Sequence, residues 1–370
     1  MKVAVISRHS VANYGSLFQA HALQKVLETK IGVDAINIDY TPSNEKGRKL
    51  VKSLVNQSRW SKSFITKLAF YIYQTPSFSY TFKKFKEFRK IYLNQTNEEY
   101  TSSEMIKNNL PNADIFCTGS DQVWNILYDG KIDNSYFLDF LPDYMPRFSY
   151  AASFGGNTFE KLSDPIYKEL LSKYSAISVR EDSGIDILKE FSLNGEQVLD
   201  PTLLLEKEYW ESLVPDIKKK EKYILIYQLR PNKEFDNYVL NFSKNKGLKL
   251  IRVSTMFFQS VKCGKFKYLP KPEEFLWLIK NADYFFTDSF HGTCFAINFG
   301  VNFSEILPGR FNARNQSLLR LVGLENRIIT DLSTYDIPEK PIDFEHVYHK
   351  LEIERKNSIE FLKKSCKIGE

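Results

Sequence analysis

The strongest constraint on the fold is a regular alternation of short apolar segments with amphipathic ones. The segment "KVAVIS" (2–7) is typical of a buried strand, and "SLFQAHALQKVLET" (16–29) has the apolar spacing of a helix. The same order returns in the second half, where "YILIYQL" (223–229) precedes "KEFDNYVLNFSKN" (233–245). Repeated βαβ units predict mostly parallel sheets with helices on both faces, which is an α/β fold.

The chain of 370 residues is too long for one core of ordinary size, so we predict two Rossmann-like domains. The polar segment "VPDIKKKEK" (214–222) interrupts the alternation. We therefore expect an N-terminal domain over 1–215, with a helical insert at about 45–92, and a C-terminal domain over 216–340. The pattern of residues 341–370 predicts a C-terminal helix that packs on the N-terminal domain.

The composition is typical of a soluble globular protein, with 43% hydrophobic and 26% charged residues. The first strand is followed at once by Arg8 and His9, which argues against a secretory signal, and no apolar run reaches the length of a membrane span. The four cysteines lack the spacing of a zinc site or a disulfide framework. We expect a cytoplasmic protein with no metal site.

Residues 46–90 carry an unusual charge. They hold twelve Lys or Arg against one acid, Glu87, so this segment is +11 within a chain of +6, and the remainder is −5. One interpretation is a solvated helical face; the other is a surface for anionic lipid headgroups or a lipid-linked diphosphate at the inner membrane face. Nucleic acid is not expected, because the basic residues are confined to one insert.

Ligands of open α/β sheets bind beyond the carboxyl ends of the strands, where several loops of this chain are polar. In "SRHSVANYGS" (7–16), Gly15 suits a tight turn and Ser16 a helix cap, so this loop is either a plain turn or an anion site. "TGSDQVWN" (118–125) brings Asp121 either as a helix cap or as a base for a hydroxyl.

Two further strand ends differ in character. In "ISVREDSG" (177–184), Arg180 suits a carboxylate or phosphate clamp, and its alternative is an ion pair with a neighbouring acid. In "VLDPTLLL" (198–205), Asp200 followed by Pro201 indicates a structural break.

The segment "YFFTDSFHGTCFAINFG" (284–300) ends a buried strand on Asp288 and Ser289, just before a lone histidine, His291. A satisfied core histidine is one interpretation. The hydroxyls around it, the close approach that Gly292 permits, and the basic residues Arg310 and Arg314 on the next loop favour a ligand site.

These stretches together resemble the polysaccharide pyruvyl transferase family, whose members are similar to two-domain GT-B glycosyltransferases. The resemblance runs through "NYGSLFQAHALQ", "GSDQVWN", "YAASFG", "SVREDSG", "DPTLLL", "TDSFHGTCFAI" and "LLRLVGLENR". It implies transfer of the pyruvyl group from phosphoenolpyruvate to a sugar of a bacterial surface glycan, such as an exopolysaccharide or capsule, with no other cofactor. Arg180 and His291 fall where the family binds the donor, whereas Ser289 stands where better-studied members have an arginine.

The resemblance and the strand ends together assign candidate roles. The catalytic candidates are His291, Asp121 and Arg180. The donor-binding candidates are Arg180, Ser289, His291, Gly292, Arg314, Asn13, Gly15 and Ser16. The acceptor-binding candidates are Asp121, Gln122, Trp124 and Tyr14. Two alternatives stay open: a GT-B glycosyltransferase that uses a nucleotide sugar, and a non-catalytic protein that binds glycans or membranes.

Overall fold

The computed structural model describes residues 1–46, 52, 63–126, 132–156, 162, 165–219, 221–230, 232–307, 313–332 and 340–367. The chain forms two compact units. Unit 1 consists of Met1–Leu204 with Lys356–Glu370, and unit 2 consists of Leu205–Arg355. Arg310, a basic residue singled out from the sequence, lies outside the described residues.

Unit 1 is built on a parallel sheet in the order β2-β1-β3-β4. Its strands are β1 (Lys2–Ile6), β2 (Asp34–Asn37), β3 (Ile115–Thr118) and β4 (Arg147–Ser149). A second, two-stranded parallel sheet joins β5 (Ser178–Val179) to β6 (Glu196–Gln197), and single bridges connect it to the strand end after β4. The polar loops predicted from the sequence follow the carboxyl ends of β1, β3 and β5.

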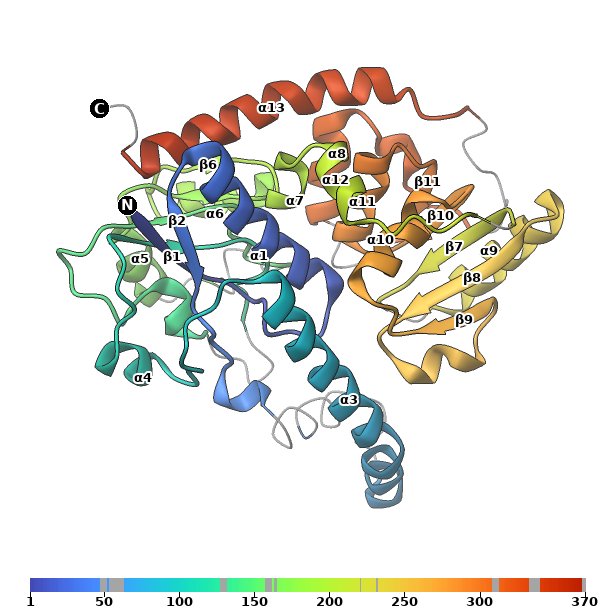
Figure 1. The fold of residues 1–370 in the computed structure, drawn as a ribbon, viewed down its shortest axis with the longest axis horizontal. Coiled ribbons are helices and arrows are strands. Elements are labelled where there is room, and N and C mark those ends of the chain that lie inside the picture. Colours follow the sequence, from blue (N-terminus) through green and yellow to red (C-terminus); the bar gives the residue numbers. More distant parts are fainter. Residues whose placement is uncertain are drawn as a thin grey trace. The chain divides into compact units, whose positions relative to one another are not determined.

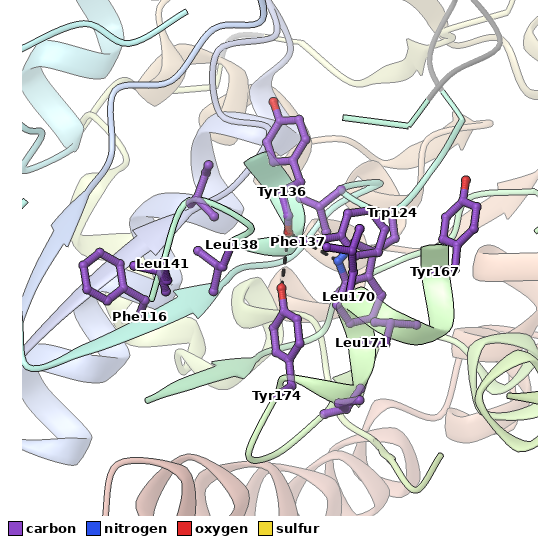
Figure 2. Packing of buried hydrophobic residues seen from close by; sticks show 14 of the residues in the cluster. Phe116, Trp124, Tyr136, Phe137, Leu138, Leu141, Tyr167, Leu170, Leu171 and Tyr174 are labelled. Atoms are coloured by element: carbon purple, nitrogen blue, oxygen red, sulfur yellow. Dashed lines mark hydrogen bonds between the residues drawn. The ribbon is translucent and has the colours of Figure 1, made fainter. Parts of the chain in front are cut away.

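Helices cover both faces of the unit 1 sheet. On one face lies α1 (Tyr14–Val26), and the last part of α13 (Phe344–Ser365) also packs on this unit, where the ring of Phe361 contacts Tyr150 at 6.4 Å. The other face carries an aromatic core (Figure 2). Its helices are α4 (Ser103–Asn108), α5 (Pro165–Ser172) and α6 (Asp182–Glu190).

The basic segment contains one long helix, α3 (Phe64–Tyr92), which begins at the Ser63 cap (Figure 1). Its last turns pack against α1 through Phe85, whose ring lies 5.2 Å from that of Tyr14. Arg89 is buried here and donates to the Ser10 carbonyl. Arg89 is therefore not one of the surface cations of this segment.

Unit 2 is built on a parallel sheet in the order β11-β10-β7-β8-β9 (Figure 1). Its strands are β7 (Tyr223–Tyr227), β8 (Lys249–Ser254), β9 (Lys265–Tyr268), β10 (Tyr284–Thr287) and β11 (Phe303–Glu305). The helices of this unit include α8 (Lys207–Leu213), α9 (Lys233–Lys246), α10 (Pro272–Lys280), α11 (Phe290–Phe299), α12 (Ala313–Val322) and the first part of α13. Short α7 (Pro201–Leu204) ends unit 1 just before them. Apolar side chains of α9 and of the strands form one core of unit 2, while Phe275 of α10 contacts Tyr227 at 4.9 Å.

Two elements of unit 2 differ from the sequence-based expectation. The edge strand β9 was not predicted, because its alternation "KFKY" is short and lies among polar residues. Arg314 was expected on a loop but lies in the first turn of α12. The segment "ARNQSLLRLV" contains no Gly or Pro and buries Leu318, Leu319 and Val322, which favours the helix.

Candidate functional site

The start of α1 faces the carboxyl ends of the unit 1 strands. Asn13 is the helix cap, because its backbone is extended and its side chain accepts the Gly15 amide at 2.7 Å. The cap was expected at Ser16, but Ser16 and Gly15 both lie inside the helix. The Ser16 hydroxyl instead donates to the Asp121 carboxylate at 2.7 Å, which joins two sequence-predicted candidates.

Asp121 follows β3 in a left-handed backbone conformation, with φ of 80°. Such a conformation costs free energy for a residue with a side chain, so the surrounding contacts must hold it. Besides Ser16, its carboxylate accepts the Gln122 amide at 2.9 Å and lies 3.7 Å from the Arg180 guanidinium. The orientation of Asp121 is therefore strongly specified.

Arg180 is buried in a group of carboxylates. Its side chain is only 1% exposed and donates to Asp200 at 2.9 Å, while Glu181 lies 3.7 Å away. Burial acts to lower the pKa of Arg180, but the charges of Asp200, Asp121 and Glu181 outweigh it, so the pKa is raised. Arg180 thus stays charged, and its charge is paired with neighbouring carboxylates.

Asp200 was assigned only a structural role from the sequence. It caps α7 by accepting the Thr202 amide at 3.0 Å, and it also binds Arg180 and the Ser120 hydroxyl. Its position was the available signal: Asp200 comes after β6, which pairs with β5, and Arg180 directly follows β5.

Two acceptor candidates, Trp124 and Tyr14, have no exposed surface. Trp124 stacks on Phe137 at 5.7 Å and donates to the Tyr136 carbonyl within the aromatic core (Figure 2). Gln122 is partly exposed beside Asp121. The two aromatic residues fill the core, so Asp121 and Gln122 are the stronger candidates for acceptor contacts.

Arg8 lies on the loop after β1 and binds Glu45 at 2.6 Å. Burial opposes its charge, but the Glu45 carboxylate raises its pKa overall. The neighbouring His9 is fully buried, and burial, together with the charge of Arg89, lowers its pKa to about 3. His9 is therefore neutral at physiological pH.

The start of α11 is the corresponding region of unit 2. Ser289 caps this helix by accepting the Gly292 amide at 3.2 Å. Thr287, the last residue of β10, accepts the Ser289 amide and donates to the Tyr227 carbonyl. A Cβ on Gly292 would lie 2.8 Å from the Thr287 hydroxyl, so this glycine permits close packing of α11 on β10.

His291 lies in the first turn of α11, with its side chain largely buried and its ring 5.2 Å from that of Phe290. Residues of a first helical turn lie near backbone N–H groups and the positive end of the helix dipole. An imidazole in this position can hold or transfer a proton beside a bound anion.

A partly buried carboxyl, Asp288, and a fully buried one, Glu305, flank this helix start, and the sequence interpretation assigned neither to the site. Asp288 accepts the amides of Leu229 and Arg230, and burial raises its pKa to about 6. Glu305, at the end of β11, is fully buried, and burial raises its pKa to about 7. Its Oε1 accepts from Thr293 and, at 3.0 Å, from Asn315.

Within the described ranges, no three His, Cys, Asp or Glu side chains are placed to hold a metal ion. In the same part of the chain, no helix is both long and apolar enough to cross a bilayer. The candidates Asp121 and Arg180 belong to unit 1, and His291 and Arg314 to unit 2. Their convergence on one donor stays a prediction.

The sequence profile of the polysaccharide pyruvyl transferases matches residues 13–304, which include the polar strand ends after β3, β5 and β10. The chain belongs to the polysaccharide pyruvyl transferase family. The family prediction is thereby confirmed, and membership indicates a transferase with a sugar or polysaccharide as acceptor. A comparison with curated proteins finds no significant match.

Solved structures similar to this family member include nucleotide-sugar enzymes. S. aureus MnaA with UDP has a TM-score of 0.56 and 11% identity over 99% of this chain and 97% of its own. The Neisseria meningitidis UDP-GlcNAc 2-epimerase bound to UDP-GlcNAc has a TM-score of 0.52 and 11% identity, with 99% of each chain covered. At this identity the likeness shows the fold alone, and it confirms the predicted GT-B-like α/β class.

Proposed function

We propose that this transferase moves the pyruvyl group of phosphoenolpyruvate to hydroxyls of a sugar, in a surface glycan or its lipid-linked precursor, to form a pyruvate ketal. The family match over residues 13–304 carries the proposal. The position of His291 at a helix start supports it, because the donor has two anionic groups and helix starts attract anions. No cofactor beyond the donor is required by this chemistry.

The reaction needs one proton delivered and two released. A proton adds to the methylene carbon of the donor, and a sugar hydroxyl attacks the oxocarbenium-like carbon. The C–O bond to phosphate breaks with its electron pair on phosphate, and the second hydroxyl closes the ring. Of the two hydroxyl protons, one balances the proton consumed and the other leaves with phosphate. We assign proton delivery to His291 and proton acceptance to Asp121.

For Arg180, the buried pair with Asp200 supports a positioning role, in which the guanidinium holds Asp121 in place. The alternative, implied by the family resemblance, is direct contact with the donor carboxylate or phosphate. The two roles differ in kinetics. Arg180→Lys should lower kcat with little change in KM for phosphoenolpyruvate if it positions Asp121, and should raise that KM if it binds the donor.

Phosphate release from phosphoenolpyruvate, measured across a panel of acceptor sugars, tests the proposed function. His291→Ala should lower the rate by about 10²–10⁴ because it removes the proton donor. The matched control is His349→Ala, which removes an exposed histidine of α13 and should leave the rate unchanged. Wild-type turnover in the His291 variant would exclude this residue from the chemistry.

The same assay separates the alternatives. The similar solved structures contain UDP or UDP-GlcNAc, so release of UDP or GDP from a nucleotide sugar would favour a glycosyltransferase. Glycan binding without phosphate or nucleotide release would favour a non-catalytic protein.

We also propose a cytoplasmic enzyme that contacts anionic membranes through residues 46–90. Lys83 and Lys90 of α3 are exposed, whereas Lys84 binds Glu87 and Lys86 binds Glu99. Replacing Lys83 and Lys90 by Gln should weaken binding to phosphatidylserine vesicles, and unchanged binding would identify the segment as a solvated face.

A further inference from the structure

The carboxyl of Glu305 connects the two helices of unit 2 that carry donor candidates. Glu305 ends β11, and its Oε1 accepts hydrogen bonds from Thr293 in the first turn of α11 and from Asn315 in the first turn of α12. His291 lies two residues before Thr293, and Arg314 lies directly before Asn315. One buried oxygen is therefore the shared acceptor of both helix starts.

Thr293 also connects Glu305 to the cap of α11. Its hydroxyl also lies within 3.3 Å of the Ser289 carbonyl, in the same turn whose cap is the Ser289 side chain. A displacement of Glu305 would thus disturb the turn that carries His291. Glu305 has no exposed surface, and its second oxygen, Oε2, has no hydrogen-bond partner among the described residues.

A buried carboxyl with few partners is costly, and a leucine or alanine would fill such a core position without that cost. We propose that Glu305 is a positioning residue of the donor site, which holds the first turns of α11 and α12 in one fixed arrangement. The effect on the donor rests on the proposed function, whereas the fixed arrangement of the two turns does not.

The charge of Glu305 adds a second consequence. The residues that face its carboxyl from α11 and α12, Thr293 and Asn315, are neutral. In the described part of the chain, the charge that acts on this carboxyl is that of Asp288, just after β10. Arg327, on the turn next to β11, is engaged by the Lys340 carbonyl. An ionised Glu305 therefore adds negative charge behind α11 and should weaken the binding of an anionic donor as the pH rises.

Hydrogen exchange of the full chain tests whether Glu305 holds the first turns of α11 and α12 in place. In Glu305→Ala, the amides of residues 290–294 and 313–317 should both exchange about tenfold faster, because both turns lose their shared acceptor. Ser304→Ala is the matched control, since it removes a hydrogen bond to Tyr284 from the adjacent residue of β11 and should leave both segments unchanged. Should Glu305→Ala not fold, Thr293→Val should accelerate exchange in the first segment and Asn315→Ala in the second. Unchanged protection in either segment overturns the proposal.

Phosphoenolpyruvate binding tests the consequence for the donor. Because the donor phosphate itself titrates near pH 6, the measurement is the difference between wild type and Glu305→Gln across about pH 5 to 9. We expect similar affinities at the acidic end and about tenfold tighter binding by the Gln variant at the alkaline end. Identical pH profiles would overturn the charge effect. If the wild type does not bind phosphoenolpyruvate, the proposed function fails, and the exchange experiment still decides the role of Glu305.

Discussion

The carboxyls at the strand ends of the two units are held by different kinds of partner. In unit 1, Asp200 and Asp121 lie beside the guanidinium of Arg180, so a cation compensates them. In unit 2, Asp288 and Glu305 are held by backbone amides, a hydroxyl and a side-chain amide, which are all neutral.

This difference sets what each group can do. Opposite charge favours the ionised form of a carboxylate, whereas burial with neutral donors favours the protonated form. Burial accordingly raises the pKa of Asp288 to about 6 and that of Glu305 to about 7. Unit 1 therefore has a fixed charge network that orients Asp121, and unit 2 has carboxyls that titrate within the physiological range.

The largest expected effect follows from removing the guanidinium of Arg180 in unit 1. Arg180→Met should lower the free energy of unfolding by roughly 3–5 kcal/mol, because it leaves buried carboxylates uncompensated. Urea unfolding of the full chain measures this loss. Adding Asp200→Asn to Arg180→Met should recover part of the stability, since it removes the closest uncompensated charge.

Lys189→Met provides the control for this prediction. Lys189 also pairs with an acid, Asp186 at 3.2 Å, but both side chains are more than two thirds exposed. An exposed pair contributes little to stability, so this variant should unfold like the wild type. Equal losses in the two variants would remove the distinction between a buried and an exposed pair.

The second prediction concerns the pH dependence of unit 2. The pKa of Glu305 is about 7 in the folded chain and 4.5 in its ordinary state, so the folded form binds its proton more tightly. The tighter proton binding contributes fully to the free energy of unfolding below about pH 4.5. This contribution, roughly 3 kcal/mol, is lost as the pH rises to about 7. Glu305→Gln cannot lose a proton, so the wild type should become less stable relative to this variant across that window.

Chemical unfolding at a series of pH values measures the difference between the two proteins. Glu274→Gln is the control, because Glu274 is a surface carboxyl of α10 that pairs with Lys267. A constant difference between wild type and Glu305→Gln would show that Glu305 does not titrate in this window.

The predictable part of the fold is the part with a strong local signal. Strands such as β1, β7 and β10 are continuous apolar runs, and the α13 helix over 344–365 follows the predicted pattern. The edge strand β9 was missed because an edge strand buries less and carries a weaker pattern.

The candidate site was predicted unevenly for a related reason. Polar residues at strand ends pointed to Asp121, Arg180 and His291, and the structure brings the first two together. Two further carboxyls were not assigned to the site: Asp200 was interpreted as a strand break, and Glu305 was not singled out. Each is connected by contacts between residues on different elements, which no sequence spacing reveals.

The smallest expected effect concerns a glycine near a helix start, a feature that both units have. Gly184 and Gly292 each lie in the first turns of a helix that packs against the strand before it. A Cβ on Gly184 would contact the Val179 side chain at 3.0 Å, whereas a Cβ on Gly292 would lie 2.8 Å from the Thr287 hydroxyl, which is held by two hydrogen bonds. Gly292→Ala should therefore destabilise the chain by roughly 1–3 kcal/mol, and Gly184→Ala by less, because Val179 makes no polar contact through its side chain. Thermal unfolding of the two variants measures the order, and a larger loss for Gly184→Ala would show that apolar crowding, not the fixed hydroxyl, limits these positions.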